Sequence, residues 1–208
     1  QAITADRVLV AVGRETLLEP LKPEAAGIQV EGGKIKVNAF QMTNRHGIYA
    51  VGDCASPFML AHAAMAEGRV AAEHAMGKQP EPIAYDMVPQ SIYSHPEAAM
   101  VGLTKEEAVK RGFDVAEGIF PLAASGRAFT EGERNGFIKL VAEKKYGRIL
   151  GVHICAPHAS EIIGEAALAL TLEATVDELI ATIHPHPTVV EGMQEAALAI
   201  TSEVRQHP

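Results

Sequence analysis

The chain has 208 residues, of which 48% are hydrophobic, and it carries a formal net charge of −8. This composition supports a buried core and one large or two small domains. The negative charge argues against a nucleic-acid or anionic-membrane partner, and no apolar run approaches the ~20 residues of a membrane span. The first residues, from Gln1, contain no initiator methionine and no signal-peptide pattern. We therefore expect a cytoplasmic chain that was cut from something longer.

In the first part of the chain, the run of β-branched residues at 7–13 predicts a buried strand that ends in a glycine. The Gly32-Gly33 pair predicts a hairpin between residues 28–30 and 35–37. A second buried strand is predicted at 48–51. We expect Cys54, just after it, and the distant Cys155 to be buried free thiols in a reducing compartment.

An alanine-rich helix is predicted over residues 60–76, and the glycine and two prolines of 77–82 mark a boundary after it. Beyond the boundary, strands are followed by helices, which predicts an α+β layer. The predicted strands cover 91–93, 99–101, 115–122, 136–141 and 149–154; a short helix opens at 104, and three more cover 159–173, 175–182 and 188–203.

The last of these helices places apolar residues at helical spacing: Val189, Met193, Ala197 and Ile200. Such a stripe indicates a core face, although its small residues also permit a dimer interface. The nine histidines show no ligand spacing such as HExxH, so we predict no metal site.

The segment before that helix holds His186 between Pro185 and Pro187, with Glu191 five residues later. Proline fixes φ and removes a backbone donor, so the imidazole is carried on stiff, non-helical backbone that suits an aimed acid–base group. An ordinary surface turn is the alternative. Thr188 and Glu191 also form a capping box, which is compatible with a carboxylate that orients the imidazole.

The predicted strand at 48–51 ends in Gly52-Asp53. A carboxylate at the carboxyl end of a strand lies where α/β folds bind nucleotides, and it could accept hydrogen bonds from ribityl or ribose hydroxyls. The alternative is a turn residue that caps the next helix.

Taken together, five stretches of the chain resemble the flavin-dependent pyridine nucleotide–disulfide oxidoreductases, and among them the dihydrolipoamide dehydrogenases. The stretches occur in the family's order at 5–14, 47–53, 59–68, 94–104 and 150–191. The resemblance implies the end of an NAD-binding domain at 1–14, the C-terminal part of an FAD-binding domain at 15–82, and an interface domain at 83–208. The fold it implies is α+β: a partial FAD-domain segment followed by an antiparallel sheet with helices packed on it, through which the family forms homodimers.

The resemblance also implies roles for particular residues. Gly52 and Asp53 would contact FAD, and the segment Leu60-Ala61-His62 would lie against the flavin. His186 would be the base and Glu191 the group that orients it, acting across the dimer on the other subunit's flavin and disulfide. The His186–Pro187 peptide would be cis. The substrate would be dihydrolipoamide on a lipoyl carrier domain, with NAD as the acceptor and a multienzyme complex as a possible partner.

The chain also departs from the family pattern. Glu15-Thr16 stands where the family has a Pro-Asn pair, and the 208 residues contain neither a GxGxxG turn nor the CxxxxC redox pair. We therefore expect the chain alone to be inactive and to hold only part of an FAD site. The alternatives are a non-catalytic dimerisation module and the same half of a glutathione reductase-like enzyme. The absence of a terminal Cys-Cys pair disfavours mercuric reductase.

Overall fold

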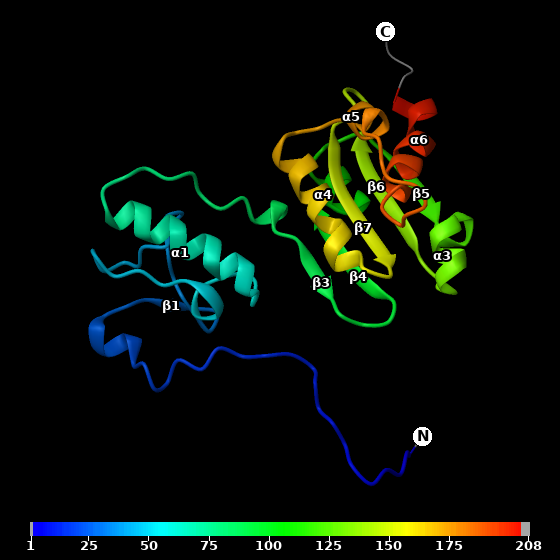
Figure 1. The fold of residues 1–208 in the computed structure, drawn as a ribbon. Helices are drawn as coiled ribbons and strands as arrows, with labels where there is room; N and C mark the ends of the chain where they lie inside the picture. The colour runs from blue at the N-terminus through cyan, green and yellow to red at the C-terminus, as the bar shows by residue number, and fades with distance from the viewer. Residues whose placement is uncertain (1, 205–208) are drawn as a thin grey trace. The chain divides into compact units, whose positions relative to one another are not determined.

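The computed structural model describes residues 2–204 and divides the chain into two compact units, residues 1–83 and 84–208. Figure 1 shows the first unit in blue to cyan and the second in green to red. Each unit is described by itself below.

The first unit is built mainly of turns around one helix. Its elements are the 3₁₀ turns η1 (Pro23–Ala26) and η2 (Gly52–Cys54), the strands β1 (Val30–Glu31) and β2 (Lys34–Ile35), and the helix α1 (Ala61–Ala75). The predicted hairpin is confirmed: Glu31 pairs with Lys34 across Gly32 and Gly33, whose φ angles of 59° and 77° suit a two-residue hairpin turn. The predicted helix is confirmed as α1.

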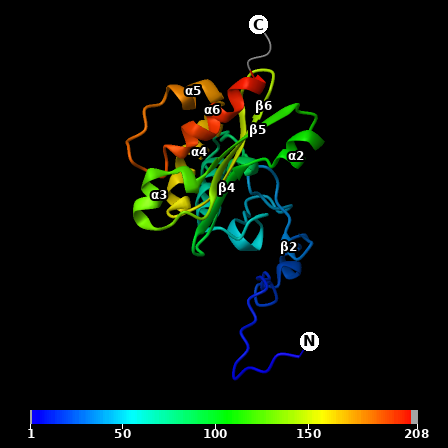
Figure 2. The same ribbon diagram turned by 90° about the vertical axis from the view of Figure 1, so that its right-hand side faces the viewer.

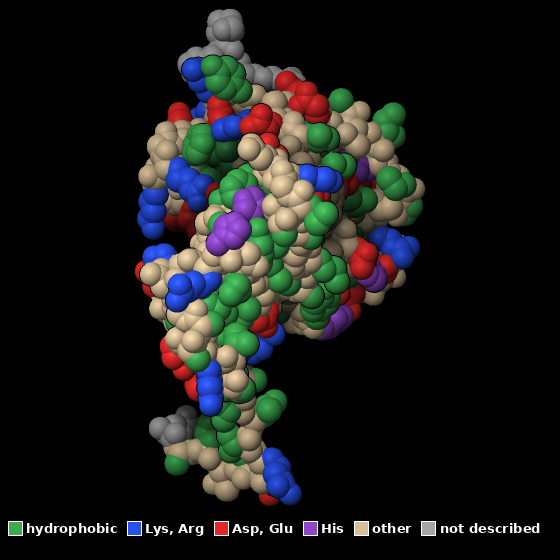
Figure 3. Space-filling view, turned by 90° about the vertical axis from the view of Figure 1, so that its left-hand side faces the viewer, with side chains coloured by type: hydrophobic (Ala, Val, Ile, Leu, Met, Phe, Trp, Pro, Cys, Tyr) green, Lys and Arg blue, Asp and Glu red, His purple; other side chains and the backbone are tan. Residues whose placement is uncertain are grey.

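The two buried strands predicted in this unit are not formed. Residues 7–13 are irregular and exposed, with Leu9 90% and Val12 94% accessible. Figure 3 shows hydrophobic side chains along this segment at the bottom of the view. Near 48–51, the structure has only an isolated bridge between Met42 and Tyr49. The apolar runs satisfy the propensity for a strand, but no described segment forms a ladder with them, and a buried strand requires partners for its backbone polar groups.

The second unit contains a five-stranded antiparallel sheet in the order β3-β4-β7-β6-β5. The strands predicted here are confirmed: β3 (Gln90–Ile92), β4 (Glu97–Gly102), β5 (Val115–Pro121), β6 (Phe137–Glu143) and β7 (Ile149–Ala156). The helices are α2 (Lys105–Lys110), α3 (Gly126–Glu131), α4 (Ala159–Thr171), α5 (Val176–Ala181) and α6 (Gly192–Val204), with 3₁₀ turns η3 (Tyr85–Met87) and η4 (Leu122–Ala124). Figure 2 shows α4, α5 and α6 on one side of the sheet and α2 on the other.

The main core lies between this sheet and helices α4 and α6. Met193, Ala197 and Ile200 are all 0% exposed, which confirms the core interpretation of the α6 stripe. Close approach of α6 depends on Gly118 in β5, because a Cβ there would lie 1.9 Å from the carbonyl oxygen of Ala196. Helix α6, which begins directly after Glu191, therefore lies in close contact with the sheet.

Candidate active site

His186 lies in the loop between α5 and α6, drawn in orange in Figure 1. Its Nδ1 atom is 2.8 Å from Oε2 of Glu191, so the structure brings together the two predicted catalytic residues. The imidazole is 78% exposed, whereas the Glu191 side chain is 19% exposed. The imidazole of the pair is therefore open to solvent, whereas its carboxylate partner is largely buried.

The hydrogen bond determines which ring nitrogen of His186 can act as a base. An ionised carboxylate only accepts hydrogen bonds, so Nδ1–H must donate to Glu191. The lone pair of the neutral ring is then on Nε2, for which residues 2–204 supply no hydrogen-bond partner. This is the imidazole–carboxylate arrangement of a general base with an orienting group.

The start of α6 differs from the prediction. Thr188 and Glu191 form the reciprocal bonds of a capping box, each backbone N–H donating to the other's side chain at 3.3 Å, but the α-helix begins only at Gly192. The Thr188 hydroxyl also donates to the carbonyl of Pro185 at 2.7 Å. These bonds close a turn and not a first helical turn, and the turn fixes the backbone beside His186. The His186–Pro187 peptide is cis, as the resemblance implied.

A second histidine of the loop has a role that the sequence alone did not reveal. Nε2 of His184 is 2.8 Å from Oε1 of Glu165 on α4, and the His184 side chain is only 3% exposed. The repeated His-Pro pair singles out His184 in the sequence. It does not indicate Glu165, which lies 19 residues earlier in the chain.

The cofactor residues predicted from the resemblance lie in the first unit. The backbone N–H of Gly52 donates to Oε2 of Glu67 at 2.7 Å, and Glu67 is 0% exposed. Gly52 has φ of 72°, in the left-handed region that favours glycine. The buried carboxylate of Glu67 thus fixes the turn that carries Asp53, a role that the sequence pattern did not predict.

Asp53 presents a half-exposed carboxylate in this turn. It forms an ion pair with Arg14 at 3.4 Å, and its carbonyl accepts a hydrogen bond from the Thr16 hydroxyl at 2.9 Å. It does not cap α1, whose N-cap residue is Leu60. The predicted alternative for Asp53, a capping role on the next helix, is therefore wrong.

The N-terminus of α1 has properties that suit a negatively charged group. Leu60 makes no side-chain capping bond, and no acidic residue lies in the first turn. Ala61 and His62 are exposed there. Because the dipole of a helix is positive at its N-terminus, this end favours negative charge placed against it.

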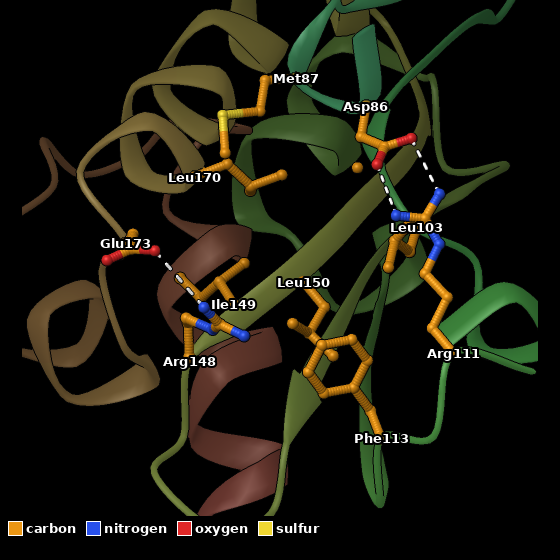
Figure 4. A pocket seen from close by; sticks show the side chains of 11 residues that line it. Asp86, Met87, Leu103, Arg111, Phe113, Arg148, Ile149, Leu150, Leu170 and Glu173 are labelled. Carbon is orange, nitrogen blue, oxygen red and sulfur yellow. Dashed lines mark hydrogen bonds and ion pairs between the residues drawn. The ribbon is translucent and has the colours of Figure 1, made fainter. Parts of the chain in front are cut away.

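A cavity of about 160 Å³ in the second unit does not include any candidate site residue. Figure 4 shows its two arginines already engaged: Arg111 with both oxygens of Asp86, and Arg148 with Glu173. The hydrogen bond from Arg111 lowers the pKa of Asp86. The charges in this hollow are thus matched internally, which indicates a structural role.

The remaining candidate groups give no further site. Cys54 and Cys155 are free but partly exposed, so the prediction of burial is wrong. Cys54 belongs to the surface turn η2, and Cys155 alternates along β7 with the core residues Ile154 and Ala156. Over residues 2–204, no group of three or more His, Cys, Asp or Glu could hold a metal ion. No helix in the same range is long and apolar enough to cross a membrane.

Comparison with known proteins matches both units to one family. The pyridine nucleotide-disulphide oxidoreductase dimerisation domain matches residues 88–197, and the pyridine nucleotide-disulphide oxidoreductase domain matches residues 1–68. Dihydrolipoyl dehydrogenase of Thermus scotoductus is 50% identical over 96% of the chain, and that of Bacillus subtilis is 46% identical over 94%. The chain spans 43% and 41% of these relatives, respectively.

Solved structures show the same relationship. LpdA from Mycobacterium tuberculosis superposes with a TM-score of 0.82 at 32% identity, covering 88% of this chain and 40% of that one. The HOCl-induced flavoprotein disulfide reductase RclA from Escherichia coli gives 0.83 at 25% identity, covering 91% and 44%. With its dimerisation domain matched over more than half its length, the chain belongs to the pyridine nucleotide-disulphide oxidoreductase family.

Proposed function

We propose that the chain is the C-terminal portion of an FAD-dependent dihydrolipoyl dehydrogenase, which oxidises dihydrolipoamide with NAD through a redox disulfide and a flavin. The observation that carries the proposal is the His186–Glu191 hydrogen bond of 2.8 Å, which leaves Nε2 available as a base. The dihydrolipoyl dehydrogenases among the relatives support the substrate assignment. The substrate would be presented on a lipoyl carrier domain, and the chain alone would be inactive.

In this proposal, residues 1–14 are the end of the NAD-binding domain, 15–82 belong to the FAD-binding domain, and 83–208 are the interface domain. FAD, when bound, would accept the electrons of the dithiol and pass them to NAD. The half-exposed carboxylate of Asp53 can accept hydrogen bonds from hydroxyl groups of FAD, and the Gly52 turn holds it in place. The segment Leu60-Ala61-His62 places the positive end of α1 where negative charge would be stabilised.

His186 would begin the reaction by taking a proton. Nε2 accepts the proton of one dihydrolipoamide thiol and leaves a thiolate, which is the nucleophile in disulfide exchange. The thiolate attacks one sulfur of the redox disulfide and displaces the other sulfur as a thiolate. Glu191 then stabilises the imidazolium through the bond to Nδ1, and the His186 proton is available for the displaced sulfur.

The disulfide and the flavin that His186 serves would come from a second subunit. The imidazole is 78% exposed, and none of the described residues approaches Nε2 as a hydrogen-bond partner. The match to the dimerisation domain supports a homodimer. The proposal therefore requires a homodimer in which each base acts on its partner.

The test uses the intact enzyme that contains this chain together with the flavin-binding and disulfide-bearing half. His186→Gln should lower dihydrolipoamide turnover by about 10²–10⁴-fold, the usual contribution of a general base, while flavin absorbance stays normal. His46→Gln, at an exposed histidine of the first unit, is the matched control and should keep full turnover. Near-normal turnover in the His186 variant would refute the assignment.

A further inference from the structure

The first half of the loop that carries His186 is held by a second histidine–carboxylate pair. Nε2 of His184 is 2.8 Å from Oε1 of Glu165, and their side chains are 3% and 31% exposed, respectively. Glu165 belongs to α4, which packs on strands β4 and β7 of the sheet. The pair therefore ties an irregular loop to one of the rigid elements of the unit.

The chemistry of this pair makes its two members depend on each other. Because an ionised carboxylate only accepts, Nε2 of His184 must carry the hydrogen of the bond. Nδ1 of the same ring is buried and has no hydrogen-bond partner among residues 2–204. Among the described residues, the bond to Glu165 is thus the only polar contact of the buried ring, so removing Glu165 leaves the imidazole of His184 without a partner.

The position of His184 couples it mechanically to the proposed base. Only Pro185 separates the two histidines, and because proline fixes φ, the backbone between them has little conformational freedom. On the other side of His186, Thr188 and Glu191 close the turn before α6. The backbone of His186 is consequently held on one side by the bond of His184 to Glu165 and on the other by the Thr188–Glu191 turn.

We propose that His184 and Glu165 are positioning residues for His186, holding its Nε2 where it can take the thiol proton. The inference rests on the proposed function, because it assigns the pair a role in that same reaction. A displacement of about 1 Å at a reacting group costs about 10²-fold in rate, so a loosened loop would be measurable as slower turnover.

The experiment compares variants of the intact enzyme that break the bond with variants that keep it. His184→Leu and Glu165→Ala remove a donor or an acceptor, whereas His184→Gln and Glu165→Gln retain an amide N–H or carbonyl oxygen of similar reach. Glu161→Gln, at an exposed site of the same helix, is the control. Each variant is assayed for kcat and KM with dihydrolipoamide, and for NADH-driven reduction of a dye, which involves no thiol proton.

For the Leu and Ala variants, we expect kcat with dihydrolipoamide to fall by about 10–100-fold while dye reduction is unchanged. The Gln variants should recover to within about threefold of the parent enzyme, and the double variant His184→Leu/Glu165→Ala should be no slower than the slower single variant, since the two act as one unit. The control should match the parent enzyme.

The inference is overturned if dye reduction falls in parallel with dihydrolipoamide turnover, because a purely structural role affects both. It is also overturned if the Gln variants are as slow as the Leu and Ala variants. If His184→Leu does not fold, Glu165→Ala decides the matter, since Glu165 is only partly buried. Normal turnover in His186→Gln would instead refute the proposed function, whereas slow His186→Gln with normal His184→Leu and Glu165→Ala would refute this inference alone.

Discussion

The turn at Gly52, which presents Asp53, allows the cost of a single methyl group to be worked out from the structure. Gly52 has φ of 72°, and a Cβ at this position would lie 3.2 Å from the Cβ of Ala64 on α1. A left-handed conformation costs a residue with a side chain about 1–2 kcal/mol, offset in part by about 0.4–1 kcal/mol from the restricted unfolded chain. The contact with Ala64 is closer than ordinary van der Waals contact, and overpacking of this kind adds about 1 kcal/mol. Gly52→Ala should therefore destabilise the first unit by about 2 kcal/mol.

Substitutions at two other glycines separate the backbone cost from the cost of the contact with Ala64. Gly47 has φ of 78° but open space around its Cβ position, so Gly47→Ala should cost about 1 kcal/mol from the backbone alone. Gly68 lies inside α1 with open space and no positive φ, so Gly68→Ala should stabilise by about 0.5–1 kcal/mol.

The assay is hydrogen exchange of the α1 amides, which reports local opening of this unit without requiring two-state unfolding of the whole chain. A cost of about 2 kcal/mol corresponds to about 30-fold faster exchange for Gly52→Ala. Exchange in Gly52→Ala that equals that of Gly47→Ala would show that the contact with Ala64 contributes nothing. Exchange unchanged from the parent chain would refute the whole calculation.

Two further predictions concern a buried imidazole and the proposed FAD contact. Burial lowers the pKa of His153, whose ring nitrogens have no hydrogen-bond partner in the described part of the chain, so the unfolded state binds the proton more readily. The contribution of His153 to the free energy of unfolding should therefore be constant above the ordinary histidine pKa of about 6.5 and fall as the pH drops below it. In urea titrations, the free energy of unfolding should decrease less between pH 7 and pH 5 in His153→Val than in the parent protein; an equal decrease in both proteins would contradict this. Asp53→Ala in the intact enzyme should weaken FAD binding by about 10–100-fold, the loss of one or two hydrogen bonds to a charged group, and titration of the flavin-free protein that shows unchanged affinity would remove Asp53 from the site.

The features that the sequence predicts correctly are those with local signals. Gly32 and Gly33 specify a hairpin turn, and Thr104 with Glu107 specifies the start of α2, where both bonds of the capping box are present. His186 and Glu191 belong to the same class, because a turn of five residues is enough to bring their side chains together. The apolar runs at 136–141 and 149–154 likewise locate β6 and β7, which contribute Ile138, Leu140, Val152 and Ile154 to the core.

The features that the sequence does not reveal depend on partners that are distant along the chain. Glu67 reaches Gly52 across 15 residues and His184 reaches Glu165 across 19, and no periodicity records either contact. For residues 7–13, the sequence predicts a strand that the structure does not form. Their apolar run has the propensity of a strand, but no described segment pairs with it. Helix α3 is also not predicted, but for a local reason, because it has only six residues and begins at Gly126, a poor helix former.

The most direct test of the central claim is a hybrid dimer. Subunits of the intact enzyme that carry His186→Gln are mixed with subunits that lack the redox cysteines, each inactive alone, and are allowed to exchange. If His186 serves the partner's disulfide, each hybrid has one complete site, and random pairing should restore about a quarter of the activity of the unmodified enzyme. Exchange confirmed by mass but with no activity restored would show that the base and disulfide work within one subunit, and would contradict the account.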